Sequence, residues 1–373
     1  MTAERLIEKL KRTEINLELV IVTTNVARTV LEINIPAADL KRIVKKLSPV
    51  NSDITTINSD SGILYAMDAD IGVSVSSSIF RNSGLLSVSS QLFKSTVSKL
   101  TKDVKLEQTG KGPLNIQSAK FKASIPIAQD SLPFPIEGGK SFSLSSEKLN
   151  SLLSFVSTVT TEKNNFDHTG SILIKGDGKN LTTVATDNHR IAFSEYPLGV
   201  EIPSTIIPSK AVKAIKDFTD NILISETPSV LFLKSNDVLV FARKTNVKFP
   251  DVYSVIPKQY VLEVKLDSNS FKDAIERVSP TVDPDTPAPR VRLDFGDTLK
   301  ISTGNDTIGK ADDELDIEHI TKPINISLTA NLKYISEFLN TVSGCVIIKL
   351  GGTGKPFMLE AGNRRLLTAG LKV

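Results

Sequence analysis

The residues of this sequence best suited to chemistry form a short polar run, Asp-Asn-His-Arg, at positions 187–190. Apolar runs at residues 181–185 and 191–193 flank it, which predicts a strand, a tight turn and a second strand. A turn with an amide, an imidazole and a guanidinium offers hydrogen-bond donors and a cation at a fixed point of a sheet. The alternative is an ordinary hairpin in which Asp187 and Asn188 hydrogen-bond to their own backbone.

Catalysis is the first chemistry to consider for this turn. Asp187 and His189 could act as an acid–base pair, but alternate residues around a tight turn rarely converge on one proton. The sequence contains no nucleophile elbow, and its histidines, His168, His189 and His319, lack metal-ligand spacing. We therefore expect no catalytic residue, no metal and no cofactor. A hydrolase built around Asp187 and His189 stays as a distant alternative.

A glycine-rich run at residues 351–355 has some features of a phosphate-binding loop. However, Lys349 stands where that loop requires its first glycine, and Pro356 stands where it requires a Ser or Thr for magnesium. We interpret the run as a turn between two strands.

Length and composition limit the class of protein. The chain has 373 residues, which suggests two or three domains of about 100–200 residues each. Its formal net charge of +3 excludes a polycation that would coat nucleic acid indiscriminately. The single cysteine, Cys345, excludes an internal disulfide framework, fits a reducing compartment, and lies in a run typical of a buried strand. No apolar run approaches the roughly 18 residues of a membrane span, so we expect a cytoplasmic protein.

Three copies of one structural plan follow each other along the chain. Each copy begins with a short strand that leads into a helix with a regular apolar stripe, at residues 32–47, 142–156 and 264–278. A second helix follows at residues 89–100, 208–218 and 329–342. Between the two helices lies a strand–turn–strand element, with its turn near Asp68, Asp187 or Asn305. The copies recur at intervals of about 110–125 residues, so the repeated unit is a whole domain.

Proline-rich strings at residues 132–136 and 248–257 close the first two copies and mark boundaries. We therefore predict three domains of one fold at residues 1–138, 139–262 and 263–373. The first includes an N-terminal extension of about 28 residues whose role is open. Two helices packed on antiparallel sheet in each domain give the α+β class.

Basic side chains gather on helix faces that point away from the predicted core. The first helix carries Lys41, Arg42, Lys45 and Lys46, which include like-charge pairs four residues apart. Such pairs are destabilising by a few tenths of a kcal/mol unless an anion meets them. Together with Lys94 of the second helix and Lys210 and Lys213 of the fourth, they are our candidates for contact with the backbone of duplex DNA, without sequence reading.

The alternative for these cations is a solvated helix face, since most charge runs are of that kind. In the last copy, Lys272 and Arg277 alternate with Asp273 and Glu276, which argues against a basic surface there. No aromatic ladder is interleaved with the basic residues, so base stacking on a single strand is not expected.

The run Thr-Asp-Asn-His-Arg-Ile-Ala at residues 186–192, in the middle of a threefold repeat, resembles a motif of the bacterial DNA polymerase III beta subunit family, the DNA sliding clamps. The usual form of that motif is Thr-Asp-Gly-His-Arg-Leu-Ala. The strings Phe-Pro-Asp at 249–251, Val-Ile-Pro at 255–257 and Val-Arg-Leu at 291–293, and Asn331 with Tyr334, support the resemblance. It covers about residues 29–373.

The resemblance implies a non-enzymatic ring. Two chains would join head to tail as a homodimer around duplex DNA, with helices lining the channel, and would tether a replicative DNA polymerase. A clamp loader is a further implied partner. Partner peptides would enter a pocket between the middle and last domains. The matching positions here are Thr186, Asn188, His189, Arg190, Ile191, Pro250, Val255, Asn331, Tyr334, Leu371, Lys372 and Val373. The alternative is a clamp-fold adaptor that binds peptides without encircling DNA.

Three departures from the family pattern carry expectations of their own. Asn188 replaces a Gly, and because both residue types readily adopt positive φ, we expect the turn to be preserved. The tail at residues 369–373 is Ala-Gly-Leu-Lys-Val instead of Met-Pro-Met-Arg-Leu, so partner peptides are expected to differ. Residues 280–289 contain four prolines where a clamp forms its third-domain interface, which bears on ring closure.

Overall fold

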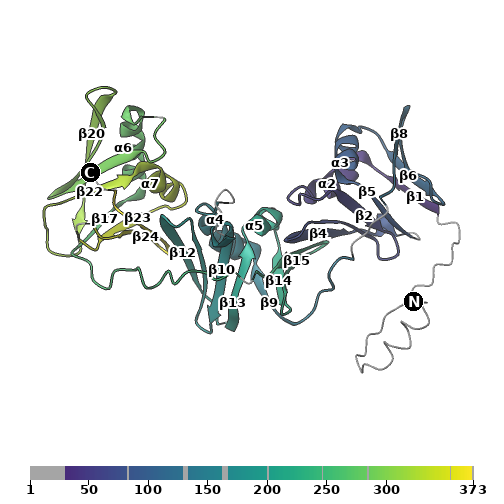
Figure 1. Cartoon of the computed structure of the whole chain (residues 1–373), viewed down its shortest axis with the longest axis horizontal. Helices are drawn as coiled ribbons and strands as arrows, with labels where there is room; N and C mark the ends of the chain where they lie inside the picture. Colours follow the sequence, from purple (N-terminus) through teal and green to yellow (C-terminus); the bar gives the residue numbers. More distant parts are fainter. Residues whose placement is uncertain are drawn as a thin grey trace, which may run out of the picture.

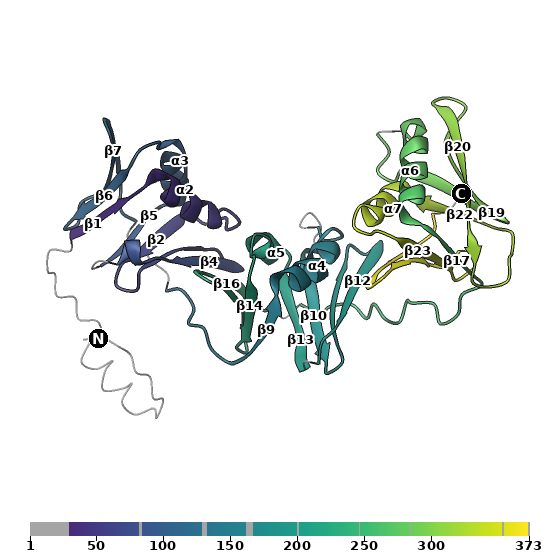
Figure 2. The same ribbon diagram turned by 180° about the vertical axis from the view of Figure 1, so that it is seen from behind.

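The computed structural model describes residues 30–81, 84–128, 133–161, 167–199, 201–245, 247–283, 285–352 and 354–371. These residues form an open arc, with the helices along its concave side and the sheets along its convex side (Figure 1). The view from behind shows the same arrangement (Figure 2). The N-terminal extension and residues 372–373 lie outside the described residues.

The described part of the chain has six α-helices, which follow one another in pairs. They are α2 (Ala37–Lys46), α3 (Ser90–Lys99), α4 (Ser146–Ser157), α5 (Lys210–Ile215), α6 (Ser268–Val278) and α7 (Leu332–Leu339). Short 3-10 helices occur at η1 (Ser78–Phe80), η2 (Asp167–Gly170) and η3 (Ser279–Thr281). Polar side chains cap four of the α-helices by accepting a first-turn amide, namely Ser89, Ser145, Asp267 and Asn331. Each of these four helices therefore begins directly after its capping residue.

Two helices differ from their predicted bounds. The helix expected at residues 329–342 begins at Leu332, because residues 329–331 belong to a strand that pairs with its neighbour and Asn331 then caps the helix. The helix expected at residues 208–218 is shorter, since Pro208 ends a strand and the regular helix stops at Ile215. In both places strand pairing, which is invisible in the local sequence, takes residues from the predicted helix.

Two four-stranded sheets lie at the ends of the arc (Figure 1). One contains, in spatial order, β1 (Val30–Ile35), β6 (Val104–Thr109), β7 (Leu114–Ser118) and β8 (Phe121–Ile125). The other contains β20 (Gly309–Asp316), β19 (Thr298–Asn305), β18 (Arg290–Phe295) and β22 (Ile326–Asn331). All neighbouring strands in both are antiparallel. Strands β8 and β20 are therefore edge strands at opposite ends of the molecule.

Two longer antiparallel sheets make up the rest of the convex side. The first has the order β5 (Leu85–Ser89), β2 (Ile54–Asn58), β3 (Ile63–Met67), β4 (Ile71–Ser76), β16 (Val238–Arg243), β15 (Val230–Ser235), β14 (Asn221–Glu226) and β9 (Lys140–Ser145). The second has the order β13 (Glu201–Pro208), β10 (Ser171–Asp177), β11 (Asn180–Thr186), β12 (Arg190–Pro197), β25 (Arg364–Thr368), β24 (Phe357–Ala361), β23 (Cys345–Leu350), β17 (Leu262–Asp267) and β21 (Glu318–His319). Each sheet joins strands that are far apart in the sequence, through the pairs β4–β16 and β12–β25.

The core lies between the helices and the sheets. Apolar stripes place Phe93 of α3, Leu152 of α4 and Phe271 of α6 at full burial. Each such side chain contributes about 1.5–3 kcal/mol through removal of apolar area from water. In the peripheral strand β7, buried and exposed residues alternate. In β4, within a long sheet, every residue is buried except the last, Ser76. The concave helices and a second covering layer on the convex side explain this difference.

That second layer is formed by the two connecting segments, which run along the convex side (Figure 1). In the first, the ring of Phe134 lies 5.3 Å from that of Tyr65 and 5.1 Å from that of Phe241. A Cβ added at Gly72 would lie 2.2 Å from Cε1 of Phe241, so the sheet needs glycine at that point. The first proline-rich string thus carries an aromatic anchor, Phe134, that contacts both halves of the first long sheet.

The remaining local expectations have mixed outcomes. Cys345 begins strand β23 as expected, but its side chain is exposed, so the predicted burial is wrong. The glycine-rich run after Leu350 does connect strands β23 and β24. Among the described residues, no helix is long and apolar enough to cross a membrane.

Candidate functional site

The polar turn at residues 187–189 is held by hydrogen bonds of its own residues. Thr186 Oγ1 donates to the carbonyl oxygen of Arg190 at 2.8 Å and accepts from the amide of Asn188 at 3.1 Å. Asp187 Oδ1 accepts the amides of His189 and Arg190 at 3.0 and 2.9 Å. Asn188 has φ 73°, which confirms the expected positive φ. Because Asp187 serves the turn, the geometry offers no support for an acid–base pair with His189.

The side chains at the tip of the turn are exposed. Asn188 and His189 both face solvent. Asn188 Oδ1 lies 2.7 Å from Nε2 of His168, and the His168 ring meets that of Phe249 edge-on with 6.4 Å between centroids. Thr368 Oγ1 donates to the carbonyl oxygen of His189 at 3.5 Å. The tip is therefore anchored on two sides while its amide and imidazole groups stay accessible to a partner.

Arg190 was expected in the turn but is the first residue of β12 and is buried. Its Nε donates to Oδ2 of Asp187 at 3.0 Å, and its guanidinium also pairs with Glu337 of α7. The guanidinium carbon lies over the ring of Tyr334, and Nη2 donates to the carbonyl oxygen of Thr158 at 3.4 Å. A guanidinium can satisfy two carboxylates and a ring face together, so Arg190 links the middle and last parts of the arc.

Helix α7 supplies the opposite side of this site. Asn331 caps the helix, with its Oδ1 accepting the amide of Lys333 at 3.0 Å. One turn later, Tyr334 is half-buried against Arg190. Burial, followed by the carboxylate of Asp187, raises the pKa of Tyr334. Its hydroxyl is therefore neutral at physiological pH and available as a hydrogen-bond donor.

An apolar cluster, separate from the main core, lies beside the turn. It consists of Val184, Phe193, Val252, Met358 and Leu367, with Ile191, Leu173, Phe249 and Ile256 packed partly against it. Among the predicted positions on the connecting segment, Pro250 and Val255 are exposed, and Val255 has a relative exposure of 49%. The segment therefore buries Val252 while its neighbours face outward. Sequence reasoning missed Val252, Met358 and Leu367, because each is an ordinary apolar residue of a strand or loop.

The C-terminal tail approaches the same region. The amide of Leu371 donates to the carbonyl oxygen of Thr329 in β22 at 2.7 Å. A Cβ added at Gly370 would lie 2.8 Å from Cδ1 of Leu328, so the tail packs closely on that strand. Lys372 and Val373 lie outside the described residues. The described tail thus lies beside the strand that leads into Asn331 and Tyr334.

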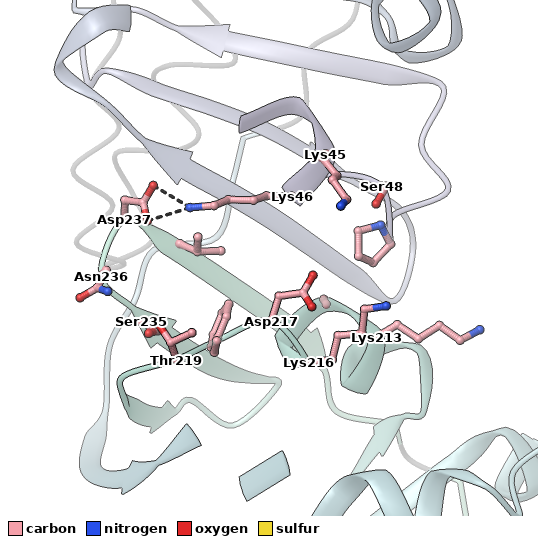
Figure 3. Close-up of a pocket in the computed structure, with 14 residues that line it drawn as sticks. Lys45, Lys46, Ser48, Lys213, Lys216, Asp217, Thr219, Ser235, Asn236 and Asp237 are labelled. Carbon is pink, nitrogen blue, oxygen red and sulfur yellow. Dashed lines mark hydrogen bonds and ion pairs between the residues drawn. The ribbon is translucent and has the colours of Figure 1, made fainter. Parts of the chain in front are cut away.

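The seven predicted DNA-contacting cations fall into two groups. Lys41, Lys45 and Lys213 lie on α2 and α5 and form no ion pair among the described residues. The other four have partners within the chain. Arg42 pairs with Asp39 at 3.1 Å, and Lys46 pairs with Asp237 at 2.9 Å (Figure 3). Lys210 pairs with two carboxylates, Asp70 at 2.6 Å and Asp68 at 3.2 Å. Lys94 donates to the carbonyl oxygens of Leu47 and Val50, at 3.2 and 3.3 Å.

Two of the engaged lysines have shifted pKa values. Burial lowers the pKa of Lys94, whose ammonium group serves the carbonyls after α2. Burial also acts to lower the pKa of Lys210, but its hydrogen bonds to Asp70 and Asp68 outweigh this and raise it. Lys210 therefore stays charged and joins α5 to the turn between β3 and β4.

Helices α6 and α7 differ from α2 and α5 in charge. Lys272 lies 3.9 Å from Glu276, Arg277 lies 2.7 Å from Asp313, and Lys333 lies 3.9 Å from Glu337. Each cation on these two helices thus has a carboxylate beside it, as the alternation in the sequence indicated. On α2 and α5, by contrast, Lys41, Lys45 and Lys213 form no ion pair within the described part of the chain.

The edge strands at the two ends of the arc carry opposite charge. On β8, Lys122 is exposed and Phe121 has a relative exposure of 46%. On β20, the exposed positions include Asp312, Glu314 and Asp316. Each strand has a free backbone edge within its sheet, so each can accept a further strand.

Metal ligation finds no candidate in the described part of the chain. No group of three or more His, Cys, Asp or Glu side chains lies close enough together there to hold an ion.

The sequence is similar to bacterial clamp proteins. Residues 253–368 match the family model described as DNA polymerase III beta subunit, C-terminal domain. The beta sliding clamp of Bacillus subtilis is 25% identical over 345 residues, which cover 84% of this chain and 89% of that protein. The beta sliding clamp of Staphylococcus aureus is 26% identical over 196 residues, which cover 48% of this chain and 49% of that protein.

Solved structures share the architecture. The crystal structure of the DNA polymerase sliding clamp from Bacillus subtilis matches with a TM-score of 0.81 and 20% identity, over 93% of this chain and 100% of that chain. The beta sliding clamp of C. crescentus matches with a TM-score of 0.82 and 18% identity, over 92% of this chain and 100% of that chain. These likenesses establish the fold, with its α+β clamp domains.

Proposed function

Because the chain belongs to the DNA polymerase III beta subunit family of sliding clamps, we propose that it encircles duplex DNA and tethers a replicative DNA polymerase to it. In this role it performs no chemistry and acts in the cytoplasm as a topological link. We further propose that its domains meet near residues 138 and 262, where the connecting segments lie.

The observation that carries the proposal is the distribution of helices and charge on the arc. The helices line the concave side, and Lys41, Lys45 and Lys213, which form no ion pair among the described residues, lie on two of those helices. A ring that slides needs weak, sequence-independent attraction, because neutralising many phosphates would bind the duplex too tightly. A few free ammonium groups beside several engaged ones meet this requirement.

Ring closure is proposed to join two copies head to tail. The arc ends in edge strand β8 on one side and edge strand β20 on the other. Pairing β8 of one copy with β20 of the next would extend the sheet across the interface and would bring Lys122 near Asp312, Glu314 and Asp316. Two such heterologous contacts close a dimer of six domains.

Partner recruitment is proposed to use the surface around the polar turn. The exposed Asn188 and His189, the half-buried Tyr334 and the outward-facing Val255 combine donors, an aromatic ring and apolar area. Such surfaces bind short peptides through a few anchor residues. The replicative polymerase and the clamp loader are the proposed partners.

Retention on circular DNA tests the central claim. After loading by the host's clamp loader, the protein is expected to stay on nicked circular DNA through gel filtration at high salt and to be lost once the DNA is linearised. Only a topological link responds to DNA ends. Equal loss from circular and linear DNA would contradict encirclement.

A second candidate function is a peptide-binding adaptor with the clamp fold that does not encircle DNA. The engagement of Lys46, Lys94 and Lys210 within the chain favours this alternative, because it reduces the positive charge available to a duplex. Mass measurement in solution separates the two. A ring requires a dimer at micromolar concentration, whereas a strict monomer would support the adaptor.

A further inference from the structure

A pocket of about 620 Å³ lies in the middle repeat, between the starts of β9 and β13. Its walls also include the end of β10, the end of β14 and Leu231 of β15. Both β9 and β13 run away from the pocket and lead into helices, α4 and α5 (Figure 1). This middle-repeat pocket therefore lies on the convex side of the arc, at the opposite end of β11 from the polar turn.

The same strand edge is covered in the other two repeats. Strands β1, β9 and β17 are equivalent, because each leads directly into the first helix of its repeat and pairs with β6, β14 or β23. In the last repeat, β21 pairs with the other edge of β17, with His319 opposite Val264. In the first, η1 lies against β1 and carries Phe80, whose side chain is fully buried. The fold thus closes this edge with a short strand or with an apolar plug.

The middle repeat has no such cover in the part of the chain that the structure describes. The connection that contains η1 in the first repeat and β21 in the last is reduced to residues 198–200 between β12 and β13. Strand β9 is accordingly the last strand of its sheet, with Ser141 and Phe142 at the pocket. A free strand edge presents backbone donors and acceptors to which a further strand can pair.

The floor of the pocket is apolar. It is formed by Phe142, Ile202, Ile224 and Leu231, and the same four residues also line an apolar cavity inside the middle repeat. Ile202, Ile224 and Leu231 are buried, whereas Phe142 is only half-buried. An apolar side chain that enters from outside would therefore cover Phe142 and be removed from water itself.

The rim of the pocket is acidic. Asp177 and Glu201 stand directly opposite each other on the paired strands β10 and β13, and both are exposed. Like charges in this arrangement are destabilising unless a cation meets them. The third carboxylate, Glu226, already pairs with Lys244 at 2.6 Å. No basic side chain lines the pocket as the described residues form it, so Asp177 and Glu201 are left to an external cation.

The charge of Asp177 is held by its own turn. The amides of Asn180 and Lys179 donate to Asp177 Oδ1 at 2.7 and 2.9 Å and lower the pKa of this carboxyl group. Asp177 is therefore fully ionised at neutral pH. Because the described residues contain no acid cluster able to hold a metal ion, the cation that suits this pair is an ammonium or guanidinium group.

We propose that the middle-repeat pocket binds a short extended segment of a partner protein, which pairs with the free edge of β9, places a bulky apolar side chain over Phe142 and directs a Lys or Arg to Asp177 and Glu201. Strand addition of this kind takes its affinity from main-chain hydrogen bonds and its specificity from pockets for alternate side chains. The inference goes beyond the proposed clamp function and holds whether or not the chain encircles DNA. A partner bound on the convex side leaves the concave side and the polar turn free.

The probe for this site is a labelled synthetic peptide, Thr-Val-Thr-Phe-Thr-Lys-Thr-Lys, in which the Phe and the first Lys are two positions apart and face the same side of a strand. Fluorescence anisotropy measures its affinity for the full chain, and hydrogen exchange with mass spectrometry locates the contact. We expect binding to slow the exchange of the amides at residues 141–143. A peptide with Glu in place of both Lys should not bind.

Two charge reversals test the acidic rim. Glu201→Lys should weaken the peptide about tenfold, because it sets a like charge against the peptide's lysines. The matched control is Asp297→Lys, on the exposed turn between β18 and β19, which should bind as the wild type does. Thermal unfolding verifies that both variants fold.

Four results would overturn the inference. Slow exchange at residues 141–143 before the peptide is added would mean that the protein itself already covers the edge. Protection at β17 or at the polar turn in place of β9 would put the peptide elsewhere. Equal loss of affinity in both variants would indicate attraction to net charge alone. Displacement of the peptide by octylamine, without protection of β9, would assign the pocket to a small amphipathic cation. Since no DNA is involved, the clamp function is left to its own test.

Discussion

The guanidinium carbon of Arg190 lies 4.1 Å from the centre of the Tyr334 ring. The two residues come from a strand of the middle repeat and a helix of the last, and Glu337 holds the same guanidinium from one turn further along α7. Arg190 is therefore mostly hidden, with a side-chain exposure of 7%, and Tyr334 covers it. A peptide that reaches this surface meets Tyr334 before it can meet Arg190.

Replacing Arg190 is expected to reduce the stability of the fold more than it reduces the binding of a partner. Arg190→Ala leaves the carboxylates of Asp187 and Glu337 without their shared cation in a partly buried place. We expect the free energy of unfolding to fall by about 3 kcal/mol, as measured by denaturant titration. Arg190→Lys should recover part of this loss, since lysine keeps the charge but not the planar fork.

The matched control for Arg190 is Arg292, which pairs with Asp294 on an exposed strand face at 2.9 Å. Arg292→Ala should change the free energy of unfolding by less than about 1 kcal/mol, because exposed pairs contribute little. If Arg190→Ala has no larger effect than this control, Arg190 does not link the two repeats as its contacts suggest.

Peptide binding provides a test of Tyr334 itself. Tyr334→Ala, and separately removal of residues 371–373, should each weaken a peptide derived from the host's replicative polymerase by about 1–3 kcal/mol, the range of an anchor position. Isothermal titration calorimetry measures the effect. Tyr196→Ala, at the far end of the strand that begins with Arg190, serves as the control and should bind normally. Unchanged affinity in both test variants would place the partner site elsewhere.

Local patterns predicted much of this architecture, because a helix stripe or a strand alternation is written in neighbouring residues. The positive φ of Asn188 also follows from residue type alone. The pairing of Arg190 with Glu337 spans 147 positions, and no spacing rule connects them. Glu337 lies four residues after Lys333 on α7, which helical spacing does indicate, but the same carboxylate also serves Arg190.

The predicted DNA-contacting cations also have partners that the local sequence does not reveal. Lys94 has the spacing of a solvent-facing lysine, yet it donates to the carbonyl oxygens of Leu47 and Val50 after another helix. Lys210 is likewise engaged by Asp68 and Asp70, far earlier in the chain. A helix pattern shows which face is polar. It does not show which partner the fold brings to that face.

Charge reversal at the edge strands tests ring closure. Lys122→Glu on β8 should weaken the proposed dimer, and Asp312→Lys on β20 should do the same, each by about tenfold in Kd at low salt. In the mixed dimer one interface pairs the two reversed charges and the other keeps both wild-type residues, so both interfaces are complementary. Dimers of mixed composition should therefore form more readily than dimers of either variant alone. Sedimentation velocity with one labelled component measures this. Equal dimerisation of all four combinations would exclude the β8–β20 contact as the interface.

The contact between Lys210 and Asp68 should make stability depend on pH in a defined direction. Burial acts to raise the pKa of Asp68, but the amides of Ile71 and Asp70 and the ammonium of Lys210 outweigh it, so the pKa is lowered from its ordinary value of 3.8. The stability that Asp68 contributes is therefore present above pH 3.8 and is lost as the pH falls through the lower folded value. Lys210, with its pKa raised above 10.5, contributes stability that is lost only in strong alkali.

Asp68→Asn should thus lower the free energy of unfolding by about 1 kcal/mol at neutral pH, and the difference from wild type should shrink below the ordinary pKa of an aspartate and vanish below the lowered pKa of folded Asp68. Denaturant titrations at a series of pH values measure both parts. Asp306→Asn is the control, because Asp306 pairs with Lys310 at an exposed hairpin and has a side-chain exposure of 94%. A difference that persists unchanged into acid would mean that Asp68 acts through its turn amides as a neutral acceptor, and that the ion pair with Lys210 does not stabilise the junction.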